Sequence, residues 1–291
     1  MRCLELMRLT RLVELSRGNE SIVIGLIDGP VDIGNPGLDS RRIKAVAPDE
    51  PIHCRDRHSA ACGHGTYIAG ILAGESEADF PGLCPGCTIL AVPVFDEFAD
   101  GRSTFASPDA VGRAIVGCVK AGARLVNISA AFPAHAIGAS PKLLAALDFA
   151  AERQVLIVVA AGNYGRIGGS VLLAHPGVIP VIAYGLDGLP AAYSNLGSSI
   201  GTRGIGAVAD GFDGLGPPGS AGTGGGTSAA SAMVTGSLAL LWSLCLDASP
   251  AAIRAAAIPD RWERRRSIVP PLLDGESAYA RLLSTTARCA A

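Results

Sequence analysis

Short apolar runs alternate with stretches of helical spacing along most of the chain. Five runs rich in β-branched residues predict strands, at Ser21–Ile27, Thr88–Phe95, Arg124–Ser129, Val155–Ala161 and Val178–Tyr184. Three stretches between them predict helices, at Thr66–Ala73, Pro108–Ala121 and Pro141–Arg153. Continuous apolar strands separated by helices are typical of parallel strands buried on both faces. The pattern therefore predicts an α/β fold with a mainly parallel central sheet flanked by helices.

One long segment, Gly214–Leu246, carries no charge and raises the question of a membrane span. Its first half is rich in Gly, Ser and Pro, and polar residues interrupt its second half. Apolar side chains in the second half recur at helical spacing, namely Val234, Leu238, Leu241, Trp242 and Cys245. We therefore expect a buried core helix that begins near Ser228, and no contact with a membrane.

Composition narrows the class of protein. Of 291 residues, 49% are hydrophobic and 17% are charged, with a formal net charge of −2. This composition is too apolar for a disordered chain, and it offers no basic surface for nucleic acid. We expect a single domain over residues 1–291, with a lead segment at 1–20 and an extension at 259–291 packed onto it. The charge run Asp260–Arg266 is interpreted as a solvated turn, and Pro270–Leu283 as a final helix.

Three polar residues occupy positions where a sheet of this kind gathers its chemistry. Asp28 follows a buried strand, His64 stands between two glycines, and Ser228 follows the glycine-rich stretch Gly222–Gly226. A serine hydroxyl becomes a good nucleophile when a histidine takes its proton and a carboxylate orients that histidine. Taken singly, these residues have plainer interpretations as a turn residue, a helix cap and a capping serine. Their order along the chain is more specific than any one of them.

That order resembles the subtilisin-like serine proteases, or subtilases. Four stretches carry the resemblance in the order of the family, namely Ile24–Gly29, His64–Ile71, Ala160–Asn163 and Gly226–Ala230. The resemblance extends over residues 20 to 258 and implies the three-layer subtilisin-like fold. It also implies a serine endopeptidase that acts on peptides through an acyl-enzyme.

The resemblance assigns a role to each matching residue. Ser228 is the expected nucleophile, His64 the general base and acid, and Asp28 the orienting carboxylate. The side-chain N–H of Asn163 and the backbone N–H of Ser228 are expected to bind the tetrahedral oxyanion. Without the resemblance, Asn163 within Gly-Asn-Tyr-Gly would be interpreted as a turn residue.

Substrate-binding residues also follow from the resemblance. The segment Leu125–Ala131 resembles the edge strand to which the family adds an extended peptide through backbone hydrogen bonds. The residues expected to line the pocket before the scissile bond are Ser129, Ala130, Ala131, Ala161 and Gly162. An ordinary core strand is the alternative interpretation of this segment.

Two positions depart from the pattern of the family. Asp28 is followed by Gly29 and Pro30, where many subtilases have Thr or Ser and then Gly. Ala232 stands four residues after the expected nucleophile, where the family commonly has Pro, and Ala is itself a good helix former. These departures keep a second hypothesis open, in which the chain is an inactive scaffold that binds peptides.

A narrower resemblance points to subtilases of bacterial peptide natural-product clusters, such as the leader-cleaving proteases of cyanobactin maturation. It rests on the short lead into Ile27–Asp32 and on Leu83–Cys87. It implies a precursor peptide as the partner of the chain. Related macrocyclases carry a helical insertion between the Asp and His motifs, whereas 35 residues separate Asp28 from His64. This spacing favours hydrolysis over cyclisation, and transpeptidation stays as a third hypothesis.

The eight cysteines are too sparse for a disulfide scaffold. Cys84 and Cys87 form a C-x-x-C, and Cys54 and Cys62 lie near His64, but the spacing is irregular for zinc or a thioredoxin-type redox site. Local disulfides or buried thiols fit better.

The chain has no dense carboxylate loop, so we expect no cofactor and no essential metal, with structural calcium left open. The first ten residues lack the apolar core of a secretory signal, which favours a cytoplasmic protein. The oligomeric state stays open.

Overall fold

Seven parallel strands form the central sheet of the computed structural model, in the order β2-β3-β1-β4-β5-β6-β7. The structure describes residues 2–47, 51–75, 81–95, 97, 106–129, 140–210, 214–216, 221–222, 224–258 and 266–285. The strands are β1 Val23–Asp28, β2 Ile43–Ala45, β3 Thr88–Pro93, β4 Leu125–Ile128, β5 Leu156–Ala160, β6 Val178–Tyr184 and β7 Ile205–Val208. A separate antiparallel pair joins β8 Gly214–Leu215 to β9 Ala221–Gly222.

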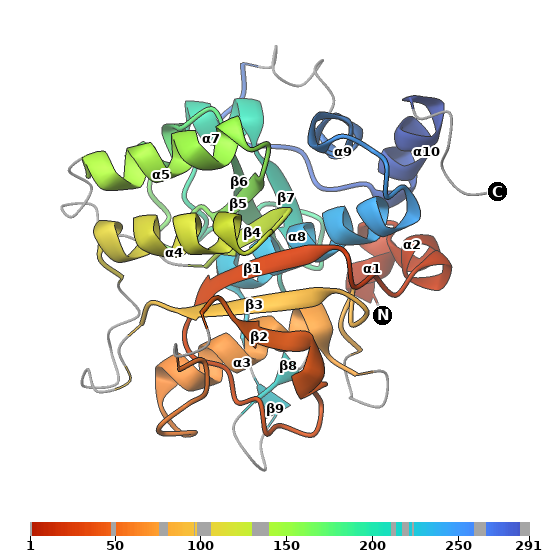
Figure 1. Cartoon of the computed structure of the whole chain (residues 1–291). Helices are drawn as coiled ribbons and strands as arrows, with labels where there is room; N and C mark the ends of the chain where they lie inside the picture. Colours follow the sequence, from red (N-terminus) through yellow and green to blue (C-terminus); the bar gives the residue numbers. More distant parts are fainter. Residues whose placement is uncertain are drawn as a thin grey trace.

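Helices cover both faces of this sheet. They are α1 Arg2–Leu6, α2 Thr10–Leu15, α3 Ala60–Ala73, α4 Pro108–Lys120, α5 Pro141–Glu152, α6 Val171–Ala174, α7 Ser198–Arg203, α8 Gly226–Leu244, α9 Pro250–Ala257 and α10 Gly275–Thr285, with a 3-10 turn η1 at Ser40–Arg42. Figure 1 shows α4 and α5 above the strands and α3 below them. Helices α3 and α8 contact each other, and α8 also contacts strands β4 to β7. The predicted three-layer α/β fold is therefore confirmed.

The elements form where the sequence pattern places them. Every residue of β4, β5 and β6 is buried, as expected for strands covered on both faces. Helices α4 and α5 each begin with a proline after a serine whose hydroxyl accepts a backbone N–H of the first turn. The five predicted strands are confirmed to within one or two residues at each end. Strands β2 and β7 were not predicted, because β2 Ile-Lys-Ala has three residues and includes a charge, and β7 Ile-Gly-Ala-Val includes a glycine and an alanine of low strand propensity.

Helix α3 begins six residues earlier than the sequence pattern predicts, at Ala60 instead of Thr66. The side chain of Ser59 accepts the N–H of Cys62 and caps the helix there. His64 therefore lies inside this helix, whereas the predicted helix at Thr66–Ala73 left it in the preceding segment. The physical reason is that most of α3 is buried, so its packing against the core, together with the Ser59 cap, outweighs the low helix propensity of the glycines on either side of His64.

Helix α8 is the core of the domain. In the part of the chain that the structure describes, it is the one helix long and apolar enough to cross a membrane by length and composition. However, 89% of its 18-residue apolar window is buried inside the protein. The prediction of a buried core helix over this segment is confirmed, with its start at Gly226.

The two ends of the described chain pack against each other. The Gly275 N–H donates to the Met7 carbonyl at 2.8 Å, and Arg8 forms ion pairs with Asp274 and Glu276. Helix α10 also contacts α2, α8 and α9. The predicted final helix is confirmed, although it begins at Gly275 instead of Pro270. Of the charge run at 260–266, the structure describes only residue 266, so the interpretation of this run as a solvated turn stays a prediction.

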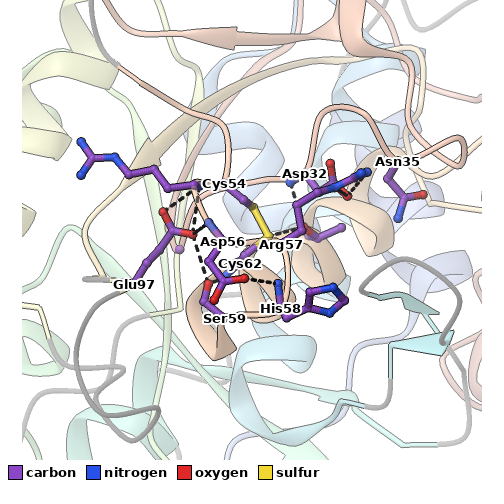
Figure 2. Close-up of a disulfide and its surroundings, with 12 residues drawn as sticks. Asp32, Asn35, Cys54, Asp56, Arg57, His58, Ser59, Cys62 and Glu97 are labelled. Carbon is purple, nitrogen blue, oxygen red and sulfur yellow. Dashed lines mark hydrogen bonds and ion pairs between the residues drawn. A yellow bond between two sulfur atoms is a disulfide. The ribbon is translucent and has the colours of Figure 1, made fainter.

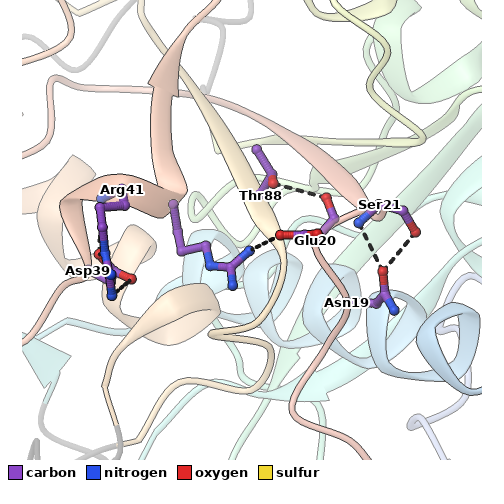
Figure 3. A network of polar contacts seen from close by, with 7 residues as sticks. Asn19, Glu20, Ser21, Asp39, Arg41 and Thr88 are labelled. Carbon is purple, nitrogen blue, oxygen red and sulfur yellow. Dashed lines mark hydrogen bonds and ion pairs between the residues drawn. The ribbon is translucent and has the colours of Figure 1, made fainter.

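A network of polar contacts lies at the amino ends of β1 and β3, as Figure 3 shows. The Asn19 side chain accepts the backbone N–H and the hydroxyl of Ser21. The Thr88 hydroxyl donates to the Glu20 carbonyl at 3.0 Å, and the Glu20 carboxylate pairs with Arg42. This network anchors the starts of the two strands and lies at the opposite end of β1 from Asp28.

Candidate active site

The carboxyl ends of β1 and β4 meet where the strand order of the sheet reverses. From β1 the chain builds β2 and β3 on one side, and β4 then continues on the other side. Crevices at such reversals are where open α/β sheets place their ligands. Ile27 pairs with Ile128 in register, and the Ser129 N–H donates to the Ile27 carbonyl at 3.3 Å. Asp28 and Ser129 therefore emerge side by side at this edge.

Asp28 and His64 form a close pair. The Asp28 Oδ1 atom lies 2.6 Å from His64 Nδ1 and also accepts the Gly29 N–H at 2.6 Å. Asp28 is fully buried, and its Oδ2 atom has no hydrogen-bond partner within the described protein. A carboxylate at Nδ1 places the imidazole proton there and leaves Nε2 as an acceptor. The pair thus has the tautomer that a general base needs.

Two glycines let the helix of His64 approach the turn after Asp28. A Cβ atom on Gly65 would lie 2.4 Å from the carbonyl oxygens of Gly29 and Pro30. A Cβ atom on Gly29 would lie 2.0 Å from the carbonyl oxygen of Ala61. Any side chain at either position would push α3 away from β1. The Gly-Pro pair after Asp28 is therefore part of the contact that joins Asp28 to His64.

The imidazole of His64 is partly open to solvent, with 28% of its side chain exposed. The Phe95 ring meets it edge-on at a centroid distance of 6.1 Å. Burial alone lowers the pKa of His64, but the charge of Asp28 and its hydrogen bond act in the opposite direction. The pKa of His64 consequently lies above its ordinary value, which strengthens it as a base.

Ser228 lies in the first turn of α8, where backbone N–H groups have no partner within the helix. Its own N–H lies near the positive end of the helix, where a developing negative charge is stabilised. Its hydroxyl donates to the Ser129 carbonyl at 3.3 Å, and no hydrogen bond joins it to His64 within the described residues. Catalytic hydrogen bonds are often long without substrate and tighten when substrate binds.

Asn163 is held by the residue that precedes Ser228. Thr227 donates both its backbone N–H and its hydroxyl to Asn163 Oδ1, each at 2.9 Å, and accepts the Gly162 N–H at 3.0 Å. Because both donors need a carbonyl acceptor, the other amide atom of Asn163 is the NH2 group. A Cβ atom on Gly226, whose φ is +73°, would lie 2.7 Å from that nitrogen. Glycine at 226 therefore keeps the space around this donor open.

Sequence reasoning missed Thr227 as a supporting residue. The available signal was a hydroxyl residue directly before the expected nucleophile at the start of a helix. It also missed Asn127, a fully buried side chain on β4. Asn127 donates to the Ser129 hydroxyl at 2.9 Å and accepts the Thr235 hydroxyl at 3.0 Å. This network ties α8 to the end of β4 beneath Ser228.

The structure describes three of the five residues that are expected to bind substrate. Strand β4 is interior, with β1 and β5 on its two sides, so Leu125–Ile128 offers no free edge to a peptide. The edge-strand interpretation is wrong for these four residues, which form an ordinary core strand. Ser129, Ala161 and Gly162 are buried at the carboxyl edge of the sheet. Ala130 and Ala131 lie outside the described residues, and the substrate-binding role of all five stays a prediction.

A disulfide joins Cys54 to Cys62, two residues before His64 (Figure 2). It connects the first turn of α3 to a segment whose Ile52 carbonyl accepts the Val31 N–H at 2.9 Å. The loop between the two cysteines has further anchors. The Glu97 carboxylate accepts two backbone N–H groups of this loop and the Ser59 hydroxyl, and Arg57 pairs with Asp32. The disulfide therefore ties the start of the His64 helix to residues 52–54, which in turn hydrogen-bond to the segment after Asp28 at Val31.

We expect the Cys54→Ser, Cys62→Ser double variant to lose about 2–3 kcal/mol of unfolding free energy, because the disulfide limits the entropy of a short loop in the unfolded chain. Urea unfolding of the wild-type protein and the double variant measures this difference. The Cys118→Ser variant, which removes a buried thiol outside any disulfide, is the matched control. An unchanged urea midpoint for the double variant would contradict the expectation.

The two cysteines of the C-x-x-C motif, Cys84 and Cys87, are buried free thiols. Among the residues that the structure describes, no group of three or more His, Cys, Asp or Glu side chains is arranged to hold a metal ion. The zinc interpretation therefore finds no ligand set in this part of the chain.

The model of the subtilase family, peptidase S8, matches residues 19–261. Fervidolysin of Fervidobacterium pennivorans is 30% identical over 274 residues, covering 86% of this chain and 39% of that protein. Subtilisin E of Bacillus subtilis strain 168 is 26% identical over 228 residues, covering 77% of this chain and 56% of that protein. The chain thus spans less than two thirds of the length of these curated relatives.

Solved structures agree closely with the fold. The prenylagaramide maturation protease PagA is 29% identical with a TM-score of 0.81, over 94% of this chain and 98% of that one. The patellamide maturation protease PatA is 30% identical with a TM-score of 0.77, over 92% and 98%. The PatG macrocyclase domain is 22% identical with a TM-score of 0.79, over 95% of both chains, and shares the fold.

Proposed function

Because this chain belongs to the subtilase family, we propose that it is a serine endopeptidase that works through an acyl-enzyme. The observation that carries the proposal is the 2.6 Å contact between Asp28 and His64 at the edge of the sheet where Ser228 lies in the first turn of α8. Asn163 and the first turn of α8 supply hydrogen-bond donors at the same edge.

The proposed reaction begins when the Ser228 hydroxyl attacks the peptide carbonyl carbon and His64 Nε2 takes its proton. The carbonyl oxygen becomes an oxyanion that accepts hydrogen bonds from the Asn163 amide and the Ser228 N–H. His64 then gives the proton to the leaving amine, and the C–N bond breaks to leave an ester on Ser228. A water molecule attacks this ester, His64 takes the water's proton and returns it to Ser228, and the peptide acid leaves.

We propose a precursor peptide of a ribosomally made natural product as the substrate. The similarity to the maturation proteases PagA and PatA, over nearly the whole of their chains, supports this proposal. The test compares kcat/KM for a cyanobactin-type precursor peptide, which carries a leader before its core, with kcat/KM for the same cleavage sequence without the leader. A clear preference for the full precursor is expected, and equal values would contradict a dedicated maturation role.

Mass spectrometry of the products separates hydrolysis from transpeptidation. Hydrolysis yields a linear acid that weighs one water more than a cyclic product of the same residues. We propose hydrolysis, because 35 residues between Asp28 and His64 leave little room for an additional helical insertion. A cyclic or amine-ligated product would contradict this choice.

The pH dependence of hydrolysis follows from His64. Its imidazole must be neutral to accept the serine proton, and its pKa is raised above its ordinary value of about 6.5. We therefore expect kcat/KM to fall with decreasing pH through a midpoint above that value. A kinetic pH profile on a chromogenic peptide measures this midpoint. In the Ser228→Ala background, the Asp28→Asn change should lower the pKa of His64 in an NMR titration. A kinetic midpoint at or below the ordinary value would contradict the expectation.

One observation favours the inactive scaffold as a second candidate function. The Ser228 hydroxyl donates to the Ser129 carbonyl at 3.3 Å and not to His64. A scaffold would bind peptides tightly and release no product. Peptide binding measured by calorimetry, without any product detected by mass spectrometry after long incubation, would support it over the peptidase.

A further inference from the structure

The segment that carries Asn163 is exposed. All residues from 163 to 169 are exposed, and Ile167 has 78% of its surface open to solvent. Such a segment has little core packing to fix its shape. The geometry of the Asn163 amide therefore depends on hydrogen bonds that hold the backbone of this segment from neighbouring elements.

Asn195 supplies many of these hydrogen bonds. Its side-chain Oδ1 accepts the N–H groups of Tyr164 at 3.2 Å and Arg166 at 3.1 Å. Its Nδ2 group donates to the Ala161 carbonyl at 3.0 Å, and its backbone N–H donates to the Gly162 carbonyl at 2.9 Å. One residue thus contacts the backbone on both sides of Asn163, through an amide that donates and accepts at once.

Asn195 is itself anchored to the sheet. The hydroxyl of the neighbouring Ser194, which is buried, accepts the Ala183 N–H at 3.0 Å and donates to the Ala183 carbonyl at 3.3 Å. Ala183 belongs to β6, one of the fully buried strands. A continuous set of hydrogen bonds therefore runs from β6 through Ser194 and Asn195 to the segment that bears Asn163.

The packing at Gly162 shows how tightly this contact is made. A Cβ atom at Gly162 would lie 2.5 Å from Asn195 Nδ2, and the φ of Gly162 is +98°. Glycine adopts this backbone conformation without strain, and it leaves the space that the Asn195 amide fills. Because an oxyanion donor acts only at about 2.7–3.1 Å from the developing charge, the loss of this support would weaken catalysis.

We propose that Asn195 is a positioning residue of the oxyanion site, acting on Asn163 through the backbone of residues 161–166. This proposal rests on the proposed peptidase function. Asn195 touches no reacting atom in the proposed reaction. Its role is to hold the Asn163 amide where the oxyanion forms.

The test is a double-mutant cycle on kcat with a chromogenic peptide. We expect Asn195→Ala to lower kcat by about 10-fold or more, with KM changed by less than about twofold. In the Asn163→Ala background, the same substitution should change kcat by less than about twofold, because the donor that it positions is gone. The Asn195→Asp variant keeps the acceptor for two N–H groups but loses the donor to Ala161, so its kcat should be intermediate.

The control is Asn19→Ala. Asn19 also accepts hydrogen bonds with its side chain, from Ser21, but it lies before β1, at the opposite end of that strand from Asp28, so this variant should leave kcat unchanged. Thermal melting shows whether each variant is folded. If Asn195→Ala does not fold, the Asn195→Asp variant tests the proposal in its place. Equal losses of kcat in both backgrounds, or a rise in KM alone, would overturn the positioning role while leaving the peptidase in place. A wild-type protein without turnover would overturn the proposed function, and the positioning role with it.

Discussion

Replacing Ser228 by alanine should abolish peptide cleavage while the protein stays folded. The variant lacks the hydroxyl that attacks the peptide carbonyl in the proposed reaction, so no acyl-enzyme would form. A loss on the order of 10⁶ in kcat is expected, a magnitude that comes from subtilisin itself. Among the described residues, the Ser228 hydroxyl makes one hydrogen bond, to the Ser129 carbonyl, so the unfolding free energy should change by about 1 kcal/mol.

Steady-state kinetics and thermal melting of the same preparation test both parts of this expectation. The matched control is Ser237→Ala, which removes another buried hydroxyl of α8, hydrogen-bonded to the Met233 carbonyl at 2.7 Å. The control should lose a similar amount of stability and keep its turnover. Undiminished cleavage by Ser228→Ala would show that another residue is the nucleophile.

Replacing Asn163 by alanine should lower kcat by about 10²–10³ with little change in KM. The magnitude again comes from the oxyanion asparagine of subtilisin. The Asn163 amide would stabilise the tetrahedral state and not the bound substrate, so its loss affects turnover selectively. Because Asn163 is exposed, water can replace it as the acceptor for Thr227, and the fold should persist.

The Asn163→Asp variant sharpens this test. A carboxylate keeps an acceptor for the two Thr227 donors but offers no N–H to the oxyanion, and it adds a negative charge nearby. Its kcat should be at least as low as that of Asn163→Ala. An unchanged kcat in either variant would remove Asn163 from the proposed oxyanion site.

Five strands could be predicted from the sequence because each is a continuous apolar run, and α4 and α5 because each is long and begins with a serine cap and a proline. Strand β6 matches its predicted range from Val178 to Tyr184 at both ends. The helix around His64 was placed too late because Gly63 and Gly65 indicate a turn by local propensity. The structure uses Gly65 for a close contact between α3 and β1 that no local pattern encodes.

The site was predictable only where a motif names the residue directly. Asp28, His64, Ser228 and Asn163 stand in recognisable short sequences, and the structure brings them to one edge of the sheet. The supporting residues come from distant segments, and Asn195 lies 32 positions after Asn163 in the chain. The pairing of Cys54 with Cys62 was open for a similar reason, since spacing alone does not fix the connectivity of several cysteines.

The most direct test of whether Ser228 and His64 form an active catalytic site is labelling with a fluorophosphonate probe, followed by intact-mass measurement. Such probes react with a serine whose proton is taken by a nearby base. The wild-type protein should gain one label, and the Ser228→Ala and His64→Ala variants should gain none. A folded wild-type protein that stays unlabelled, or a Ser228→Ala variant that is labelled as fast as the wild type, would contradict the account.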